Sequence, residues 1–419
     1  MNSDKSTQLQ LAIDILLTAK QAPYYAHKYS QVGDISTWAD WAQVPILERQ
    51  ELYDHTYPRS TDMFTGPLQD AFVSSTGGSS GTARTIVLSG DEWDVMNQHQ
   101  AQAFAALGIR STDIVANMFV AGHLWPSFIG AHEMIMRNHC VHLPISANIG
   151  VEEAYKLCRE YKPTVMISLP TFFVLMADMA KKDGRPFESL RMVAYVGEQL
   201  SHEAEDYIRK WLGCTEVKPL AYTSGDCGIM GYQTDDCGFG EYHTLHDFQL
   251  IEIVHPDTLQ PVAMGEKGEI LVTSLCRKFH PIIRYRIGDM AQWVTADKYR
   301  LCGRAGEDFK LGGAYVTVGE FERAISQLDA LSLNFVIELA DVGGQMDLLI
   351  KVECDHPEQH AQEAHRLEDL LAECIEPIGG GRDKGFFRHY AVQLVPLCTL
   401  PRNPITGKIK KVIDHRVEG

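Results

Sequence analysis

Between about residues 70 and 300, short runs of strand-forming residues alternate with helical stretches, and this alternation constrains the fold most. The run TVMISLP (164–170) precedes TFFVLMADMAKK (171–182), and MVAYVG (192–197) precedes SHEAEDYIRKWLG (201–213). Such alternation predicts α/β layers with largely parallel strands. The segment 248–275 instead contains two strand-like runs around a Pro-Asp turn, which predicts an antiparallel β appendage.

Helical spacing of Leu9, Ile13, Leu16 and Leu17 predicts a helix over residues 6–30. Glycine and charge cluster in CGRAGEDFKLGG, where the pattern changes to strand, strand, helix and strand. We therefore expect an α/β protein with a large N-terminal domain of layered sheets, residues 1–304. A small mobile α+β domain, residues 305–419, is expected to follow.

Composition limits the class of protein. The 38 basic and 55 acidic residues give a formal charge of −17, which argues against nucleic acid or an anionic membrane as the main partner. The first ten residues lack the basic and apolar regions of a signal peptide, and no apolar run approaches the ~18 residues of a membrane span. Ten cysteines without a C-x-x-C pair favour reduced thiols and a cytoplasmic location.

The run SSTGGSSGTAR (74–84) is rich in glycine, serine and threonine. It matches G-x-S-x-G, which suggests a serine hydrolase with Ser79 as the nucleophile. A nucleophile elbow, however, needs a helix after the serine. Here β-branched residues follow, which favours a strand and equally excludes a Walker A loop. The remaining alternatives are a flexible hairpin tip and a loop whose N–H groups and hydroxyls, with Arg84, bind a triphosphate.

Three further segments carry polar groups suited to a nucleotide. AYTSGDCG (221–228) follows an apolar run and would place Tyr222 and Asp226 at the carboxyl end of a strand, although a buried Tyr and a turn Asp would explain it too. PIIRYRIGDMAQW (281–293) contains Asp289, suited to ribose hydroxyls or to a plain Arg–Asp ion pair. LPRNPITGKIKKVID (400–414) presents Lys408 as either a solvated charge or one that swings into an active site.

In this order the segments resemble the adenylate-forming superfamily, which includes acyl-CoA synthetases, adenylation domains and luciferase. SSTGGSSGT and IIRYRIGD are most similar to its phenylacetate–CoA ligase-like branch, over residues 10–415 or so. The resemblance implies ATP, Mg²⁺ and coenzyme A, with a small, aromatic or otherwise compact carboxylic acid as substrate. The acid would attack the α-phosphate of ATP, and CoA would then displace AMP from the acyl-adenylate.

The resemblance also implies roles for individual residues. Lys408 would bridge the carboxylate and the α-phosphate, and Arg304 would assist Asp289 at the ribose. The phosphates would lie along Ser75, Thr76, Gly77, Gly78, Ser79, Ser80, Gly81, Thr82 and Arg84; adenine would lie near Gly197, Glu198, Gln199, Ala221, Tyr222, Thr223 and Ser224; Asp226 would bind the metal; and His123, Trp125, Phe128 and Tyr222 would line the acyl pocket.

The sequence departs from the family pattern at several positions. Asp226 stands where Glu is usual, Gly225 where Ser or Thr is common, and Gly306 at the hinge position. Ligand types suited to a structural zinc occur at Cys227, Cys237, His243 and His246, with free thiols and surface histidines as the alternative.

Other functions stay open at this stage. The acyl group could pass to a carrier-protein thiol or an amine, some relatives adenylate a hydroxyl group, and a nucleotide sensor without catalysis is a further alternative. A homodimer is compatible with the resemblance.

Overall fold

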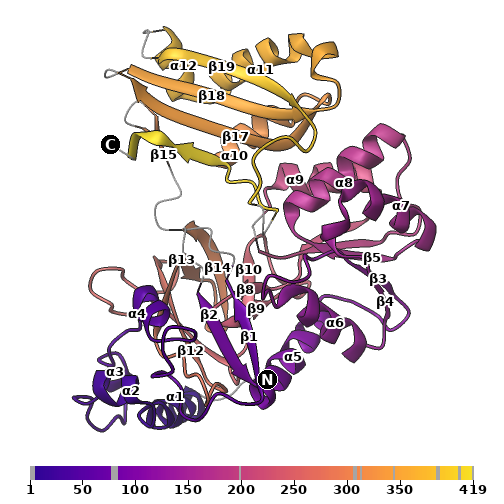
Figure 1. Ribbon diagram of the computed structural model, residues 1–419. Helices are drawn as coiled ribbons and strands as arrows, with labels where there is room; N and C mark the ends of the chain where they lie inside the picture. Colours follow the sequence, from indigo (N-terminus) through magenta and orange to yellow (C-terminus); the bar gives the residue numbers. More distant parts are fainter. Residues whose placement is uncertain are drawn as a thin grey trace. The chain divides into compact units, whose positions relative to one another are not determined.

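Strands and helices alternate as the sequence predicts, and the fold is a mixed α/β architecture. The computed structural model describes residues 5–76, 84–197, 200–304, 309–311, 314–342, 345–383, 387–403 and 407–417. The chain divides into two compact units, whose helices and strands are labelled in Figure 1: unit 1 comprises residues 1–144 and 219–305, and unit 2 residues 145–218 and 306–419. The division after residue 305 falls within CGRAGEDFKLGG, the predicted domain boundary, but residues 145–218 group with the C-terminal residues. The domains 1–304 and 305–419 therefore stay a prediction.

The first helical segment of unit 1 is interrupted, contrary to the single helix expected over 6–30. It forms α1 (Lys5–Ala19) and α2 (Pro23–Lys28), separated by an extended residue, Ala22. Proline has no N–H and its ring clashes with a preceding helical turn, so it begins a helix rather than continuing one. Two short helices follow, α3 (Trp38–Trp41) and α4 (Arg49–Asp54).

A strand hairpin and two helices come next in unit 1. β1 (Ala71–Ser75) pairs antiparallel with β2 (Thr85–Ser89), and α5 (Gly90–Ala106) follows directly. Ser89 and Glu92 form a capping box that satisfies free N–H groups at the start of α5. β3 (Ile114–Asn117) and β4 (Val141–Pro144) then pair in parallel on either side of α6 (Ser127–Arg137).

An antiparallel sheet forms the rest of unit 1 and is larger than the predicted appendage. Its strand order is β11-β12-β13-β14-β10-β9-β8. The expected antiparallel pair, β11 and β12, lies at one edge. The strands are β8 (Tyr222–Ser224), β9 (Gly228–Tyr232), β10 (Glu241–Thr244), β11 (Gln249–Val254), β12 (Lys267–Ser274), β13 (Tyr285–Trp293) and β14 (Lys298–Arg304).

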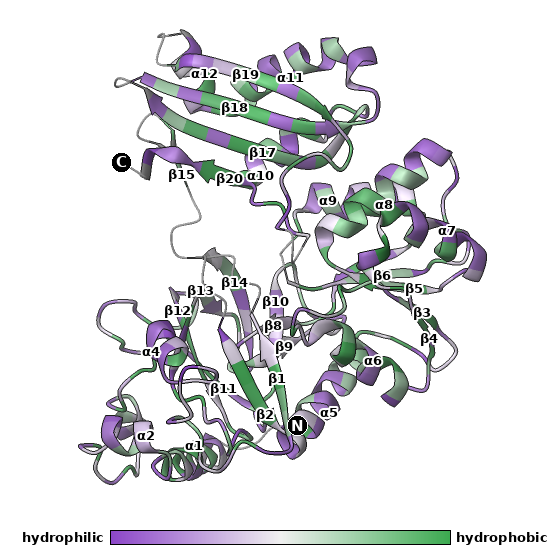
Figure 2. Ribbon diagram, viewed as in Figure 1, coloured by the Kyte–Doolittle hydropathy of each residue, from purple (hydrophilic) through white to green (hydrophobic). Residues whose placement is uncertain are grey.

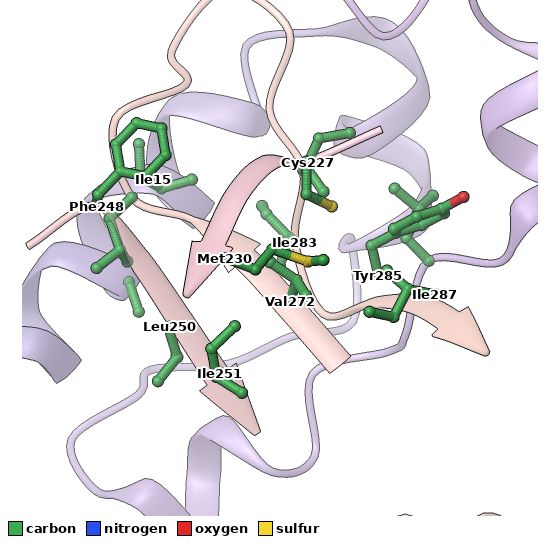
Figure 3. Close-up of a cluster of buried hydrophobic side chains, with 14 of the residues drawn as sticks. Ile15, Cys227, Met230, Phe248, Leu250, Ile251, Val272, Ile283, Tyr285 and Ile287 are labelled. Atoms are coloured by element: carbon green, nitrogen blue, oxygen red, sulfur yellow. The ribbon is translucent and has the colours of Figure 1, made fainter. Parts of the chain in front are cut away.

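The main apolar core of unit 1 joins the N-terminal helices to this sheet. Figure 3 shows Ile15 of α1 in one cluster with Cys227, Met230 and Tyr285. Phe248, Leu250, Ile251, Val272, Ile283 and Ile287 complete the labelled part of the cluster. Burial of these side chains, at about 25 cal/mol per Å² of apolar surface, fixes the backbone that carries the polar residues described below.

The first part of unit 2 contains the predicted parallel strands and their helices. β5 (Val165–Ser168) pairs in parallel with β6 (Met192–Tyr195), and β7 (Glu216–Pro219) lies beside β6. α8 (Pro170–Asp183) starts with proline and ends at Gly184, whose left-handed conformation suits glycine. The other elements are η1 (Ala147–Ile149), α7 (Val151–Tyr161) and α9 (His202–Leu212).

The C-terminal part of unit 2 has the predicted hairpin, helix and strand. β17 (Leu331–Val342) and β18 (Gln345–Cys354) are antiparallel, and the strand order is β19-β18-β17-β20. Hydrophobic and hydrophilic residues alternate along β18 (Figure 2), and its burial alternates in the same way. The remaining elements are β15 (Phe309–Leu311), β16 (Ala314–Val316), α10 (Val318–Ile325), η2 (Pro357–Gln359), α11 (Ala361–Cys374), α12 (Glu376–Asp383), β19 (Phe387–Pro396), β20 (Val412–Asp414) and η3 (His415–Val417). Among the described helices, none combines the length and hydropathy needed to cross a membrane.

Candidate nucleotide site

The two ends of the glycine-rich segment are tied together by the β1–β2 hairpin. The Thr76 N–H donates to the Arg84 carbonyl at 2.9 Å, and the Arg84 N–H donates to Thr76 Oγ1 at 3.0 Å. A strand follows the segment, which opposes a nucleophile elbow at Ser79. Gly77, Gly78, Ser79, Ser80, Gly81 and Thr82 lie outside the described residues, so the phosphate roles expected of them stay predictions.

Arg84 and Asp226, which are far apart in sequence, form a buried ion pair. Arg84 Nε donates to both carboxylate oxygens at 3.1 and 3.2 Å, and Arg84 Nη2 lies 2.7 Å from Asp226 Oδ2. Their side chains are only 15% and 6% exposed. The Tyr285 hydroxyl donates to the same carboxylate at 2.8 Å. The predicted phosphate ligand and the predicted metal ligand therefore lie in one cluster and neutralise each other.

Burial and charge both act on the ionisation of this cluster. Burial alone would lower the pKa of Arg84, but the Asp226 carboxylate raises it. Burial raises the pKa of Tyr285, and the nearby Asp226 charge raises it further. Tyr285 therefore stays protonated and remains a hydrogen-bond donor to Asp226.

Asp226 lies in a tight turn between two antiparallel strands, and the strand formed by the preceding apolar run, β7, ends at Pro219. Tyr222 belongs to β8, which pairs antiparallel with β9, and Asp226 lies between these strands. Ser224 Oγ accepts the Cys227 N–H at 3.0 Å and so closes the turn. A Cβ on Gly225 would lie 2.8 Å from Thr76 Cγ2, closer than real contacts allow. The missing side chain at Gly225 thus permits the turn to pack against β1.

Tyr222 and Asp289 are in direct contact. The Tyr222 hydroxyl donates to Asp289 Oδ2 at 2.6 Å, and burial raises the pKa of Tyr222. Asp289 lies within β13 rather than at a turn, and its register partner in β14 is Arg304. The residues expected around adenine and ribose are thus neighbours on one sheet, although no side-chain geometry is described for Arg304.

Three of the four expected acyl-pocket residues, His123, Trp125 and Phe128, lie on a left-handed turn and the helix that follows it, whereas Tyr222 lies in β8. Gly122, His123 and Leu124 all have positive φ, at 93°, 54° and 61°. The Ser75 N–H donates to the Leu124 carbonyl at 2.8 Å, which places this turn beside the end of β1. The rings of His123 and Trp125 lie 6.4 Å apart, and Trp125 and Phe128 are half-buried.

In unit 2, Lys408 contacts the segment that the resemblance places beside adenine. The Lys408 ammonium donates to the Gly197 carbonyl, across 211 residues of sequence. Gly197 has a positive φ of 93°, and a Cβ there would lie 3.3 Å from Lys408 Nζ. Glu198 and Gln199 lie outside the described residues.

The four proposed zinc ligands do not come together as one site. Cys237 and His243 group with Asp236, whose carboxylate also accepts from Lys298 at 3.1 Å. Cys227 instead packs in the apolar core, and burial raises its pKa to about 12. His246 hydrogen-bonds to Thr244. The expectation of a Cys/His zinc site is therefore not supported.

Two buried residues of the cluster were missed by sequence reasoning. Arg277 donates to the Asp226 carbonyl at 2.7 Å, and its Nη2 lies 3.0 Å from His280 Nδ1. Burial lowers the pKa of both groups, that of His280 well below its ordinary value. His280 directly precedes the PIIRYRIGD segment and Arg277 lies four residues before it, but no local pattern distinguishes them from surface residues.

Comparisons with known proteins give the class. The family model described as AMP-binding enzyme matches residues 26–276. The phenylacetate–coenzyme A ligases of Escherichia coli K12 and Aromatoleum evansii are each 24% identical, over 421 and 422 residues that cover 95% of this chain and 91% of each relative. A crystal structure of 2-hydroxyisobutyryl-CoA ligase in complex with 2-HIB-AMP has a TM-score of 0.80 at 20% identity, covering 98% of this chain and 89% of that one.

The fold and the family match together define an adenylate-forming enzyme, an AMP-forming ligase. The chain belongs to the AMP-binding enzyme family, and within it is phenylacetate–CoA ligase-like.

Proposed function

We propose that this enzyme is an acid–CoA ligase that activates a small, aromatic or otherwise compact carboxylic acid. The observation that carries the proposal is the cluster of Arg84, Asp226 and Tyr285, which joins distant motifs of the family at one place in unit 1. The likeness over 95% of the chain to enzymes named phenylacetate–coenzyme A ligases supports CoA as the acceptor. The half-buried aromatic residues Trp125 and Phe128, which follow the turn that contacts the end of β1, support an aromatic substrate.

The chemistry would be positioning and charge neutralisation rather than covalent catalysis by the protein. A carboxylate attacks the α-phosphate of ATP and expels pyrophosphate, and the thiol of CoA then attacks the acyl carbon and expels AMP. Fixed cations stabilise charge that develops on the phosphate oxygens. In this proposal Lys408 supplies the cation between carboxylate and α-phosphate, and the loop ending at Arg84 holds the distal phosphates.

The Arg84–Asp226 pair would exchange partners when the nucleotide binds. Arg84 is a bidentate donor suited to phosphate, and Asp226 offers the single carboxylate with which proteins commonly hold Mg²⁺ beside substrate phosphates. Magnesium bound there would neutralise polyphosphate charge, with Asp226 as its protein ligand. Tyr222 and Asp289 would hold the nucleoside, since their contact fixes a ring and a carboxylate side by side.

The experiment is acid-dependent ATP–pyrophosphate exchange, measured over phenylacetate, benzoate, hydroxybenzoates, short aliphatic acids and 2-hydroxy acids. We expect exchange with at least one compact acid, and CoA-dependent release of AMP with the same acid. Asp289→Asn is expected to raise the KM for ATP. Absence of exchange with every acid would refute the proposal, and acyl transfer to a phosphopantetheine carrier protein but not to CoA would reassign the acceptor.

All ten cysteines are free thiols, which supports a cytoplasmic location for the enzyme.

A further inference from the structure

Arg277 is a buried cation that is held by main-chain carbonyls and a histidine. Its side chain is almost fully buried, and among the residues that the structure describes no carboxylate forms an ion pair with it. A buried charge without a counter-ion is costly, and such costs persist mostly where the charge has a function. The hydrogen bonds of Arg277 go to main-chain carbonyls and to a histidine instead.

These hydrogen bonds join the two segments that deliver the ion pair. Arg277 Nη1 donates to the carbonyl of Asp226 at 2.7 Å, and Nη2 approaches the carbonyl of Val87 in β2 at 3.5 Å. Asp226 carries the carboxylate, while β2 begins one residue after Arg84. The Arg277 guanidinium therefore links the turn that contains Asp226 to the strand that directly follows Arg84.

His280 orients this guanidinium. Its Nδ1 faces Arg277 Nη2 at 3.0 Å and the Val87 N–H at 3.4 Å, both of which can only donate. Nδ1 must therefore accept, which places the ring proton on Nε2, 3.1 Å from Thr56 Oγ1. The ring is fully buried and neutral, as this arrangement requires.

Two carboxylates act on the charge of Arg277 without pairing with it. Burial lowers the pKa of Arg277, and the charges of Glu92, which is itself buried, and Asp226 oppose this effect. Hydrogen bonds to two carbonyls and to His280, rather than an ion pair, therefore set the direction of the guanidinium.

We propose that Arg277, oriented by His280, is a positioning residue of the nucleotide site. It holds the Asp226 turn against β2, so that Arg84 and Asp226 present their charges to the ATP polyphosphate in one fixed arrangement. This inference rests on the proposed function, because it assumes that ATP binds at Arg84 and Asp226.

The test compares Arg277→Lys with a matched buried arginine. Arg284 is equally buried, but it donates to the carbonyls of Ala42 and Val44 and pairs with Glu252. Lysine keeps the charge in both variants but cannot bridge two acceptors in the same way. Affinity for ATP with Mg²⁺ is measured by calorimetry, and the KM for ATP and kcat by pyrophosphate exchange.

We expect Arg277→Lys to weaken ATP binding and to raise the KM for ATP about tenfold or more, since charge-assisted hydrogen bonds are lost. Arg284→Lys should lower the thermal midpoint without changing the KM for ATP by more than about twofold. The Arg277→Lys effect should shrink in an Arg84→Met background, because there is then no guanidinium left to position. An unchanged KM for ATP, or full additivity with Arg84→Met, overturns the inference.

A second pair of variants keeps the test available if Arg277→Lys does not fold. His280→Asn retains an acceptor near the Nδ1 position and should keep ATP affinity close to that of the wild type. His280→Leu removes the acceptor and should weaken ATP binding; equal affinities for the two variants overturn the inference. A wild-type protein that binds ATP but catalyses no exchange refutes the proposed ligase function while leaving this comparison of affinities intact.

Discussion

Replacement of Arg84 by methionine tests whether the buried ion pair has the energetic weight that its geometry implies. The substitution removes three contacts of 2.7–3.2 Å from a carboxylate that is 6% exposed. Removing one partner of a buried pair typically costs about 3–5 kcal/mol, because the other charge stays buried. The Tyr285 hydroxyl, 2.8 Å away, still stabilises Asp226, so we expect a loss of about 3 kcal/mol, at the lower end of this range.

The assay is thermal unfolding at pH 7 without nucleotide, for Arg84→Met, Asp226→Asn and the double variant. A loss of about 3 kcal/mol lowers the midpoint by roughly 6–12 °C for a cooperative unit of this size. The double variant should recover most of this loss, since it removes both charges of the pair. The exposed pair Lys156–Glu153, with side chains 69% and 54% exposed, serves as the control and should show no measurable coupling.

Two results would refute this reasoning. The first is an Arg84→Met variant as stable as the wild type, which would mean that Asp226 is solvated in solution. The second is a double variant whose loss equals the sum of the single losses, since additivity shows that the two side chains do not interact.

Two further predictions concern packing and pH. Gly225→Ala should cost about 1–3 kcal/mol of unfolding free energy, because its Cβ would overlap the Thr76 methyl group at 2.8 Å. Thr76→Ser in the same chain should recover part of that cost; equal midpoints for Gly225→Ala and the wild type would show that the turn is not packed as described. Asp178 is a buried carboxyl whose pKa burial raises from 3.8 to about 6, so the folded state holds its proton more tightly than the unfolded state. Its contribution to the free energy of unfolding therefore falls as pH rises from about 4 to 6, by about 3 kcal/mol in total. Asp178→Asn should match the wild type near pH 4 and exceed its thermal midpoint above pH 6; a difference independent of pH would contradict the assignment.

The sequence predicted the layered α/β class, the antiparallel pair of β11 and β12 and the C-terminal hairpin, because each rests on a local pattern of apolar residues. It also singled out Arg84 and Asp226, although their pairing across 142 residues could not be read from either segment. The separate strand that contains Tyr222 was not predicted, because a strand's local pattern does not determine its pairing partner. β8 is a separate short strand that pairs with β9.

The burial of Arg277 and His280 beneath the site could not be predicted from the sequence, for a physical reason. Arg277 and His280 belong to a charged, mixed stretch, and charged residues are mostly exposed in proteins. Arg277 contacts Val87 and Asp226, which lie 190 and 51 residues away, and His280 contacts Val87 across 193 residues. The expected zinc site is not supported for a similar reason, since the local sequence did not show that Cys227 packs in the apolar core.

The most direct test of the central claim separates the two half-reactions in a Lys408→Ala variant. We expect acid-dependent pyrophosphate exchange to be abolished, while CoA attack on a supplied acyl-adenylate is largely retained, because the Lys408 ammonium is assigned only to adenylation. Lys410→Ala, a change of a neighbouring exposed lysine, should leave both half-reactions near wild-type rates. Equal loss of both half-reactions in Lys408→Ala, or unchanged exchange, would contradict the assignment of Lys408 to adenylation.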